Sequence, residues 1–241
     1  MRKQTREAQA ESSTSLSSVL PAPLKRVVDI AKEKGASSWL STLPIAEHGF
    51  NLHKGDFRDA LCLRYGWKPN GLPPRCVCDK AFTVEHSLSC PHGGFPSIRH
   101  NEIRDITAKY MIEVCHNVGV EPPLQSLSGE TMSYRTANIE DGARLDIAAQ
   151  GFWGGDKVRA FFDVRVFNPF ARTYHNQSLA ASYRKNEQEK KRAYDQRVRE
   201  VEYGYFSPLV FTSSGGMGPT ARVVYKRLES ITGRTARQWT G

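Results

Sequence analysis

Long apolar runs are missing from this sequence. No stretch approaches the length of a membrane-spanning helix, and no charged-then-apolar leader stands at its start. The sequence therefore predicts neither a membrane protein nor a secreted one. Cysteine is scarce as well, with five residues, an odd number. In a chain without a secretory leader, such cysteines favour reduced thiols and a metal site over a disulfide framework.

The composition predicts a mostly globular chain. Hydrophobic residues make up 39% and aromatic residues 10%, enough to build a core, while charged residues are at an ordinary 24%. At 241 residues, the chain suits one large domain or a small module joined to a medium one. The net charge of +9 favours a polyanionic partner, because neutralising phosphates releases counterions.

Three of the five cysteines gather in one short segment, CVCDKAFTVEHSLSC, as Cys76, Cys78 and Cys90, with His86 between them. Three thiols and one imidazole complete a tetrahedral zinc shell, and four protein ligands leave no open position for catalysis. His92 lies close by as an alternative fourth ligand. The flanking sequence offers no apolar run long enough to build a core. The segment therefore predicts a structural zinc clip.

The hydrophobic pattern predicts a mixed α/β fold. Helical spacing marks residues 23–34, 56–65, 97–114, 177–202 and 219–231, and strand-like runs mark 144–149, 158–167 and 206–213. This order of helices and strands is typical of a mixed sheet with helices on both faces. The first twenty or so residues are polar and rich in serine, which favours a flexible start.

Two aspartates interrupt apolar, strand-like runs: Asp146 in ARLDIAAQ and Asp163 in FFDVRVF. A charge in such a run must be solvated, paired or bound to a metal. If the two strands are neighbours, the pair forms an oxygen-rich site for Mg²⁺. The alternative is that each aspartate ends a strand in a surface ion pair.

Lys190 lies in the middle of the apolar stripe of the long helix at 177–202, which should pack on the sheet. A lysine on such a face is often a side chain that extends its ammonium to solvent. Beside two aspartates, it becomes a candidate for stabilising a pentacovalent phosphate.

Several segments together resemble the C-terminal region of certain non-LTR retrotransposon proteins, in which a Cys-Cys-His-Cys knuckle precedes a restriction-like endonuclease of the PD-(D/E)xK superfamily. The matching segments are SSWLSTLPI, FRDALCLRYGW, the CVC…H…C knuckle, RHNEIRD, ARLDI, FFDVRVFNP and FSPLVFTSSGGMG. They cover about four fifths of the chain, and each alone is weakly specific.

The resemblance implies a domain order and a fold. It implies a flexible N-terminus at 1–22, a helical linker region at 23–75, a zinc knuckle at 76–96, an endonuclease domain at 97–233 and a tail at 234–241. The endonuclease domain would be a restriction-endonuclease-like central sheet flanked by helices.

The resemblance also implies roles for particular residues. Asp146 matches the aspartate of the family's Arg/Lys-Pro-Asp element, with Arg144 at the basic position and Leu145 where proline is usual. Asp163 matches the second metal-binding acid, and Arg165 stands where the lysine of the superfamily often lies. In such retroelement nucleases the lysine can move to the following helix. Lys190 is the first candidate for this lysine and Lys191 the second. Glu102 or Asp105 would supply an outer carboxylate, and Arg99 and His100 would contact phosphates. Glu121, at the end of the first strand, ranks below these residues.

The implied activity is a Mg²⁺-dependent nick in DNA that leaves a 3′ hydroxyl for a reverse transcriptase to extend. DNA and element RNA would be partners, the polymerase would belong to a longer parent protein, and the location would be nuclear. Two alternatives stay open: a zinc-knuckle nucleic-acid-binding fragment with a decayed active site, and a structural or interaction protein. Leu145, Arg165 and the lack of a recognisable reverse transcriptase core favour decay, whereas the intact acid pair and lysine favour activity.

Overall fold

The structure is a computed structural model that describes residues 11–12, 14–15, 18–48, 51–125, 144–174 and 176–233. The expected tail at 234–241 lies outside the described residues, as does much of the expected N-terminal segment 1–22. The main helices are α2 (Ala22–Ala31), α3 (Lys54–Tyr65), α4 (Val84–Ser87), α5 (Phe95–Ile112), α6 (Leu179–Glu200) and α7 (Pro219–Thr232). Short 3-10 turns occur at Ser38–Leu40, Ala46–His48 and Arg172–Tyr174.

The described strands form one mixed sheet: β1 (His116–Val120), β2 (Ile147–Gln150), β3 (Arg159–Phe167) and β4 (Tyr205–Thr212), in the order β1-β2-β3-β4. The β1–β2 and β2–β3 pairs are antiparallel, and β3 and β4 run parallel with α6 as their crossover. The expected mixed α/β class is therefore confirmed. Within the part of the chain that the structure describes, no helix is long and apolar enough to cross a membrane.

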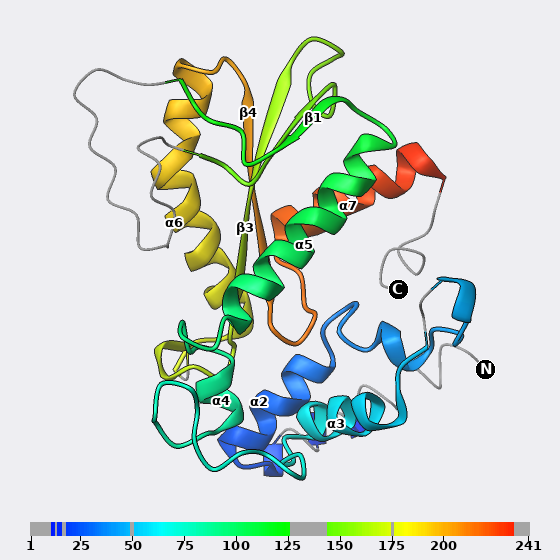
Figure 1. Cartoon of the computed structure of the whole chain (residues 1–241), viewed down its shortest axis with the longest axis vertical. Helices are drawn as coiled ribbons and strands as arrows, with labels where there is room; N and C mark the ends of the chain where they lie inside the picture. Colours follow the sequence, from blue (N-terminus) through cyan, green and yellow to red (C-terminus); the bar gives the residue numbers. More distant parts are fainter. Residues whose placement is uncertain are drawn as a thin grey trace.

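Helices cover both faces of the sheet, as Figure 1 shows. On one face, α5 and α7 contribute Met111 and Leu228 to the larger core, together with Phe162 and Val164 of β3. On the other face, α6 packs against Phe161 and its neighbours on the sheet. The alternation of side chains along β3 thus places Phe161 and Asp163 on the α6 face.

Local sequence accounts for the ends of the helices around the sheet. Ser178 caps α6 by accepting a hydrogen bond from Ala181 N at 3.2 Å. Proline stands at the start of α7, where its missing N–H costs nothing. Gly218, the N-cap of α7, has no side chain to offer, and the carboxylate of Glu187 on α6 accepts from Thr220 N at 2.8 Å instead. A residue in the middle of α6 therefore completes the start of α7.

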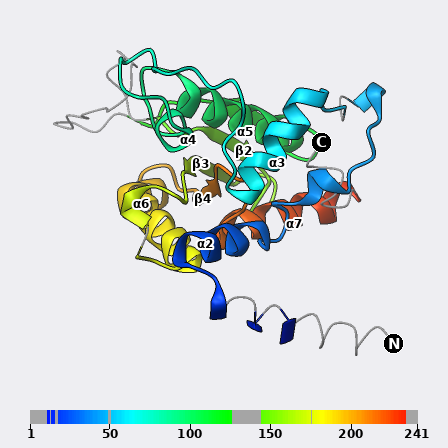
Figure 2. The ribbon, with the colours of Figure 1, turned by 90° about the horizontal axis from the view of Figure 1, so that it is seen from below.

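Helix α2, which the sequence placed in a separate linker region, packs with α3 and contacts the segment between β3 and α6; Figure 2 shows these helices from below. Arg26 donates to the carbonyls of Pro169 and Gln177, at 3.0 Å and 2.9 Å. Glu33, just after α2, is buried against Tyr183 and Gly216, and a Cβ at Gly216 would overlap the Glu33 carboxylate. The absence of a side chain at Gly216 therefore lets α2 approach the turn after β4.

Candidate functional site

The Cys-Cys-His-Cys group is assembled from a tight turn and a short helix. Cys76 N donates to Lys80 O at 2.9 Å, and Asp79 takes a left-handed conformation with φ 63°, so the chain reverses within a few residues. Thr83 caps α4 by accepting from His86 N at 3.0 Å, and this short helix carries His86. The turn and the helix together bring the ligands of both halves of the motif to one place.

The four side chains of this group converge on one point. Their ligand atoms all lie within 4.8 Å of one another. Cys76 Sγ lies 3.7 Å from Cys90 Sγ, and Cys78 Sγ lies 3.1 Å from His86 Nε2. Thiolates bound tetrahedrally at a Zn–S distance of about 2.3 Å are about 3.8 Å apart, so the sulfur separation suits such an ion. The group could therefore bind a metal such as zinc. His92, the alternative ligand, is exposed and not a member of this group.

Three acidic residues form a row at the sheet: Glu121 directly follows β1, Asp146 directly precedes β2, and Asp163 lies within β3. The register pairs Val120 with Ile147 and Ile147 with Phe162. Continuing this register by one residue places Glu121, Asp146 and Asp163 side by side along the backbone. The hydrogen bond from Glu121 N to Asp146 O, at 2.9 Å, supports that register. This register places Asp146 and Asp163 next to each other on adjacent segments of the sheet.

Strand β2 begins three residues later than the sequence pattern predicted, and the Asp146 side chain explains the difference. Asp146 Oδ2 accepts a hydrogen bond from Val164 N at 2.5 Å. The carboxylate thus takes the position that a backbone carbonyl of β2 would otherwise occupy opposite β3. This bond holds Asp146 beside the residue that follows Asp163.

Asp163 forms a buried ion pair with Lys190 of α6. Asp163 is 6% exposed, and its Oδ2 lies 2.5 Å from Lys190 Nζ. That oxygen accepts no well-aligned hydrogen bond from the described residues, although it is buried. Burial raises the pKa of Asp163 to about 6; the positive charge of Lys190 opposes this rise, and the negative charge of Asp146 adds to it. The two aspartates are therefore close enough to repel each other electrostatically.

His100 of α5 contacts the Asp146 carboxylate directly. Its Nε2 lies 3.1 Å from Asp146 Oδ2, and its side chain is 30% exposed. Burial lowers the pKa of His100, but the hydrogen bond and the charge of Asp146 outweigh burial, so the pKa is raised overall. The sequence proposed His100 as a phosphate contact, and the structure places it against Asp146 instead.

Arg104 and Glu189 are charged residues at this site that the sequence analysis did not select. Arg104 contacts Glu121 and also lies 2.7 Å from Asp105. Glu189 Oε2 pairs with Arg165 Nη1 at 3.1 Å, so Arg165, two residues after Asp163 on β3, already has an acidic partner. A helical wheel could have placed Glu189 near the face of α6 that meets the sheet, but only the register of β3 against α6 pairs it with Arg165.

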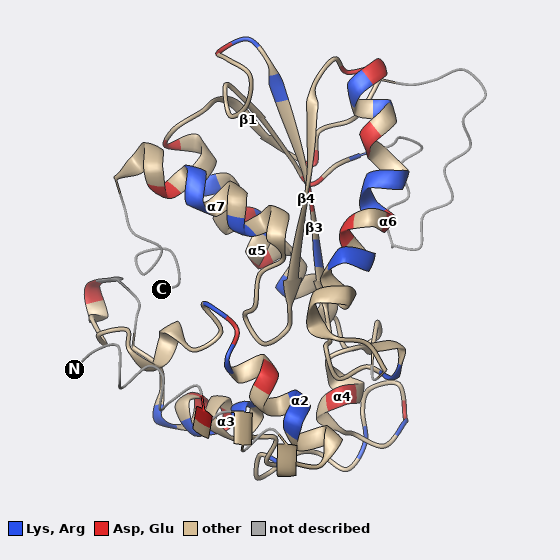
Figure 3. Ribbon diagram, turned by 180° about the vertical axis from the view of Figure 1, so that it is seen from behind, with Lys and Arg blue, Asp and Glu red and all other residues tan. Residues whose placement is uncertain are grey.

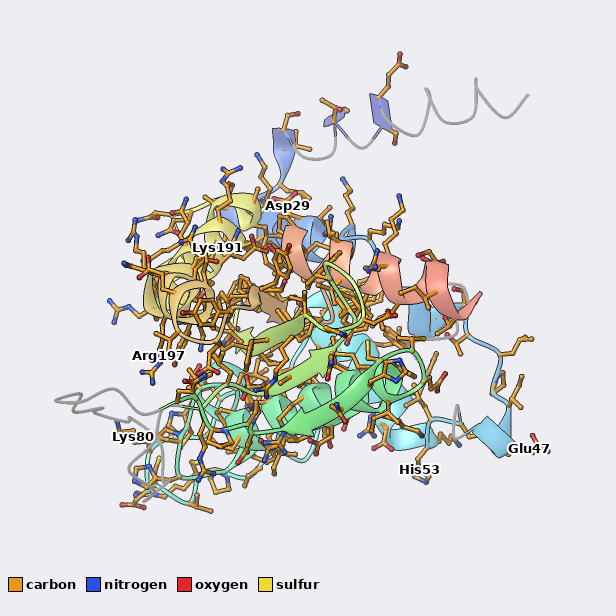
Figure 4. The ribbon with its side chains drawn as sticks, turned by 90° about the horizontal axis from the view of Figure 1, so that it is seen from above. Asp29, Glu47, His53, Lys80, Lys191 and Arg197 are labelled. Atoms are coloured by element: carbon orange, nitrogen blue, oxygen red, sulfur yellow. The ribbon has the colours of Figure 1, made fainter. Side chains whose placement is uncertain are left out.

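The other predicted residues lie at different distances from the carboxylate pair. Arg144 Nη1 lies 4.0 Å from Glu121 Oε2, at the edge of the acidic row. Arg99 donates to Leu88 O at 2.7 Å. Asp105 pairs with Arg104, and Glu102 is exposed on α5 without a contact to either aspartate among those described. Lys191 is exposed on α6 and labelled in Figure 4, whereas Lys190 turns inward. The structure thus brings together Asp146, Asp163, Lys190 and His100, with Glu121 beside them.

Asp146 and Asp163 are the residues of this arrangement that could hold a hard divalent cation. Carboxylate oxygens are the ligands that such ions prefer, and one of those here, Asp163 Oδ2, also contacts Lys190 Nζ at 2.5 Å. A cation between Asp146 and Asp163 would offset their mutual repulsion. A scan against protein-family models finds no match for this chain, and no curated protein matches it.

Proposed function

We propose that this chain is the C-terminal part of a non-LTR retrotransposon protein, and that residues 97–233 form a restriction-endonuclease-like domain of the PD-(D/E)xK type that nicks DNA. The observation that carries the proposal is the meeting of Asp146, Asp163 and Lys190 from three separate elements. Asp146 and Lys190 lie 44 positions apart in the sequence (190 − 146 = 44), yet both lie close to Asp163. A sheet with helices on both faces is also what the resemblance implies.

In this proposal Asp146 and Asp163 hold Mg²⁺. When bound, the ion polarises the scissile phosphate and lowers the pKa of an attacking water. Lys190 keeps its ammonium next to Asp163 and is placed to offset negative charge that develops on the phosphate. Val164 N and His100 hold the Asp146 carboxylate in orientation. The Cys-Cys-His-Cys group would bind Zn²⁺ as a structural ion, since all four of its ligands come from protein.

The partners belong to the same proposal. DNA would be the substrate, and the net charge of +9 favours binding to its phosphates. Basic residues lie along α6, the helix that carries Lys190, as the blue bands of Figure 3 show. A reverse transcriptase region in a longer parent protein would extend the 3′ hydroxyl of the nick, with element RNA as its template, in the nucleus.

A nicking assay on supercoiled plasmid with Mg²⁺ tests this function. We expect the parent chain to produce open circles, and Asp146→Ala to lower the rate at least about 100-fold, because it removes a metal ligand. Lys190→Ala and Lys191→Ala form a matched pair on α6. The first should lower the rate about 100-fold, and the second should leave it within about threefold of the parent, because Lys191 is exposed. Nicks should prime extension by a DNA polymerase without prior end repair.

One observation favours the nucleic-acid-binding alternative. Arg165, at the usual place of the catalytic lysine, is paired with Glu189. If the parent chain binds plasmid in a salt-dependent way but never nicks it, the decayed module is the correct function. Equal nicking by Asp146→Ala and the parent chain would contradict the proposed active site.

A further inference from the structure

The first turns of α5 lie between the Cys-Cys-His-Cys group and the acidic row. Two consecutive residues there, Arg99 and His100, contact different parts of the molecule. Arg99 Nη2 donates to Leu88 O at 2.7 Å, and His100 Nε2 lies 3.1 Å from Asp146 Oδ2. Consecutive helical residues point about 100° apart, so one rigid turn can contact both partners at once.

The contact of Arg99 depends on the conformation of the metal-ligand segment. Leu88 is the residue that ends α4, two residues after His86 and two before Cys90. A helix of four residues is not stable by itself, so the position of the Leu88 carbonyl follows from the ligands on either side of it. Metal bound by those ligands would therefore hold the acceptor of Arg99 in place.

The contact with Leu88 O is the one hydrogen bond of the Arg99 guanidinium among the described residues. Its Nε and Nη1 atoms are buried, and neither has a hydrogen-bond partner among the described residues. The bond from Nη2 to Leu88 O is therefore the main compensation for burying its guanidinium. A guanidinium held in this way is not presented to a phosphate, which argues against the role that the sequence favoured.

His100 restricts the orientation of Asp146. The same oxygen, Asp146 Oδ2, accepts from His100 Nε2 and from Val164 N. Two donors on one oxygen define the rotation of the carboxylate and leave Oδ1 as the oxygen available to a further ligand. On its other side, His100 Nδ1 lies 3.3 Å from Asn101 Oδ1, within the same helical turn.

We propose that Arg99 and His100 are positioning residues that couple the Cys-Cys-His-Cys group to the Asp146 carboxylate. Metal in the cysteine group holds Leu88, Leu88 holds Arg99, and the turn of α5 then holds His100 against Asp146. The cysteine group therefore controls how well Asp146 and Asp163 bind a divalent cation. This inference rests on the proposed function insofar as that function makes the two aspartates a cation site.

Calcium binding tests the coupling without relying on catalysis. The full chain with its zinc bound is titrated with Ca²⁺ by calorimetry. We expect His100→Ala and Arg99→Ala each to weaken Ca²⁺ binding about 10-fold, because each removes one hydrogen bond to a fixed partner. His100→Gln, which keeps an N–H donor, and Arg99→Lys, which keeps a cation, should recover most of the affinity. Lys109→Ala, an exposed position further along α5, is the control and should match the parent.

A second set of Ca²⁺ titrations compares zinc-free protein with the zinc-bound protein. Zinc-free parent protein should bind Ca²⁺ about 10-fold more weakly, and zinc removal should add little to the effect of Arg99→Ala, because both act through the same contact. Affinity for DNA in Ca²⁺ should change less than about twofold in His100→Ala, which a general loss of folding would not allow. Circular dichroism confirms that each variant is folded.

Three results would overturn the coupling: unchanged Ca²⁺ binding in His100→Ala, tighter binding in that variant, or fully additive effects of zinc removal and Arg99→Ala. A parent chain that binds no Ca²⁺ would overturn it as well. If instead the parent binds Ca²⁺ with the expected pattern but never nicks DNA in Mg²⁺, the coupling stands and the proposed endonuclease activity fails.

Discussion

Asp163 is a charged residue in a buried environment on β3. It is 6% exposed, on a strand whose neighbours are phenylalanine and valine, and its compensation is the ammonium of Lys190 at 2.5 Å. A buried carboxylate with one partner is costly, because leaving water takes several kcal/mol that a single ion pair repays only in part. Carboxylates with a perturbed pKa and a charged partner are common at functional sites, which agrees with the place of Asp163 in the candidate site.

The ionisation of Asp163 makes the stability of the protein depend on pH. Burial raises its pKa from 3.8 to about 6. Between these values the folded state keeps a proton that the unfolded chain has released, so the free energy of unfolding falls as pH rises. The contribution of Asp163 is full below about pH 4 and lost by about pH 6, up to about 3 kcal/mol in total.

Urea unfolding from pH 4 to 7, with zinc as the sole divalent cation, measures this dependence. We expect the slope of the parent between pH 4 and 6 to be smaller in Asp163→Asn; burial also raises the pKa of Glu33, which leaves a decline of the same sign in both proteins. His100, whose pKa is raised above 6.5, adds a similar decline at higher pH in both proteins. A slope between pH 4 and 6 that persists unchanged in Asp163→Asn would show that another group carries it.

Helix α6 performs two tasks at the scale of the secondary-structure element. Its inward face carries Lys190 to the carboxylate pair, and one turn earlier Glu187 closes the start of α7. Since α7 packs on β4 and α6 joins β3 to β4, the capping contact fixes both helices to the same pair of strands. The position of Lys190 along the sheet therefore depends on the contact between Glu187 and α7.

Replacing Glu187 tests that dependence. Glu187→Gln keeps the acceptor for Thr220 N but loses the negative charge at a helix N-terminus, and should lower the free energy of unfolding by about 1 kcal/mol. Glu187→Ala removes the acceptor too and should cost about 2 kcal/mol or more. Gln188→Ala, at the exposed neighbouring position, should stay within about 0.5 kcal/mol of the parent. Urea denaturation measures all three, and equal stability of Glu187→Ala and Gln188→Ala would exclude the capping role.

At the scale of the whole molecule, the Cys-Cys-His-Cys segment differs from the sheet in how it is held. From residue 70 to 94, Cys90 is the one buried residue, whereas the sheet contributes most of the core. A segment without a core of its own needs a cross-link, and a metal bound by the Cys-Cys-His-Cys group would provide it. The sheet and the segment should therefore respond differently to loss of metal.

We expect the purified chain to carry about one zinc ion. Removing it should expose residues 70–94 to proteolysis while the sheet stays folded. Cys90→Ser should lose the metal, and Cys62→Ser, at a thiol outside the group, should keep it. Elemental analysis and limited proteolysis measure both effects. A chain that folds its 70–94 segment equally well without metal would contradict this account.

Much of the architecture could be predicted from the sequence because its signals are local. The periodic apolar positions predicted α5, α6 and α7 to within a few residues, and the strands at 158–167 and 206–213 correspond to β3 and β4. The metal-ligand group could be predicted too, because all its ligands fall within one short stretch and a short loop can close only in a few ways. Lys190 was distinguished from Lys191 by helical periodicity alone.

The tertiary structure decided which groups meet Asp146. The sequence pattern indicated an acidic residue in an apolar run. It did not indicate that the Asp146 carboxylate accepts from Val164 N in place of a backbone carbonyl. It also did not indicate that the neighbour of Asp146 on α5 is His100 and not Glu102. These pairings depend on the register of β2 against β3 and on the rotation of α5 over the sheet. Both are set by the packing of side chains that are far apart in the sequence. The sequence by itself thus determined most of the elements, the Cys-Cys-His-Cys group, the two aspartates and Lys190, whereas long-range packing determined the contacts among them, because no local signal encodes the angle at which two distant elements pack.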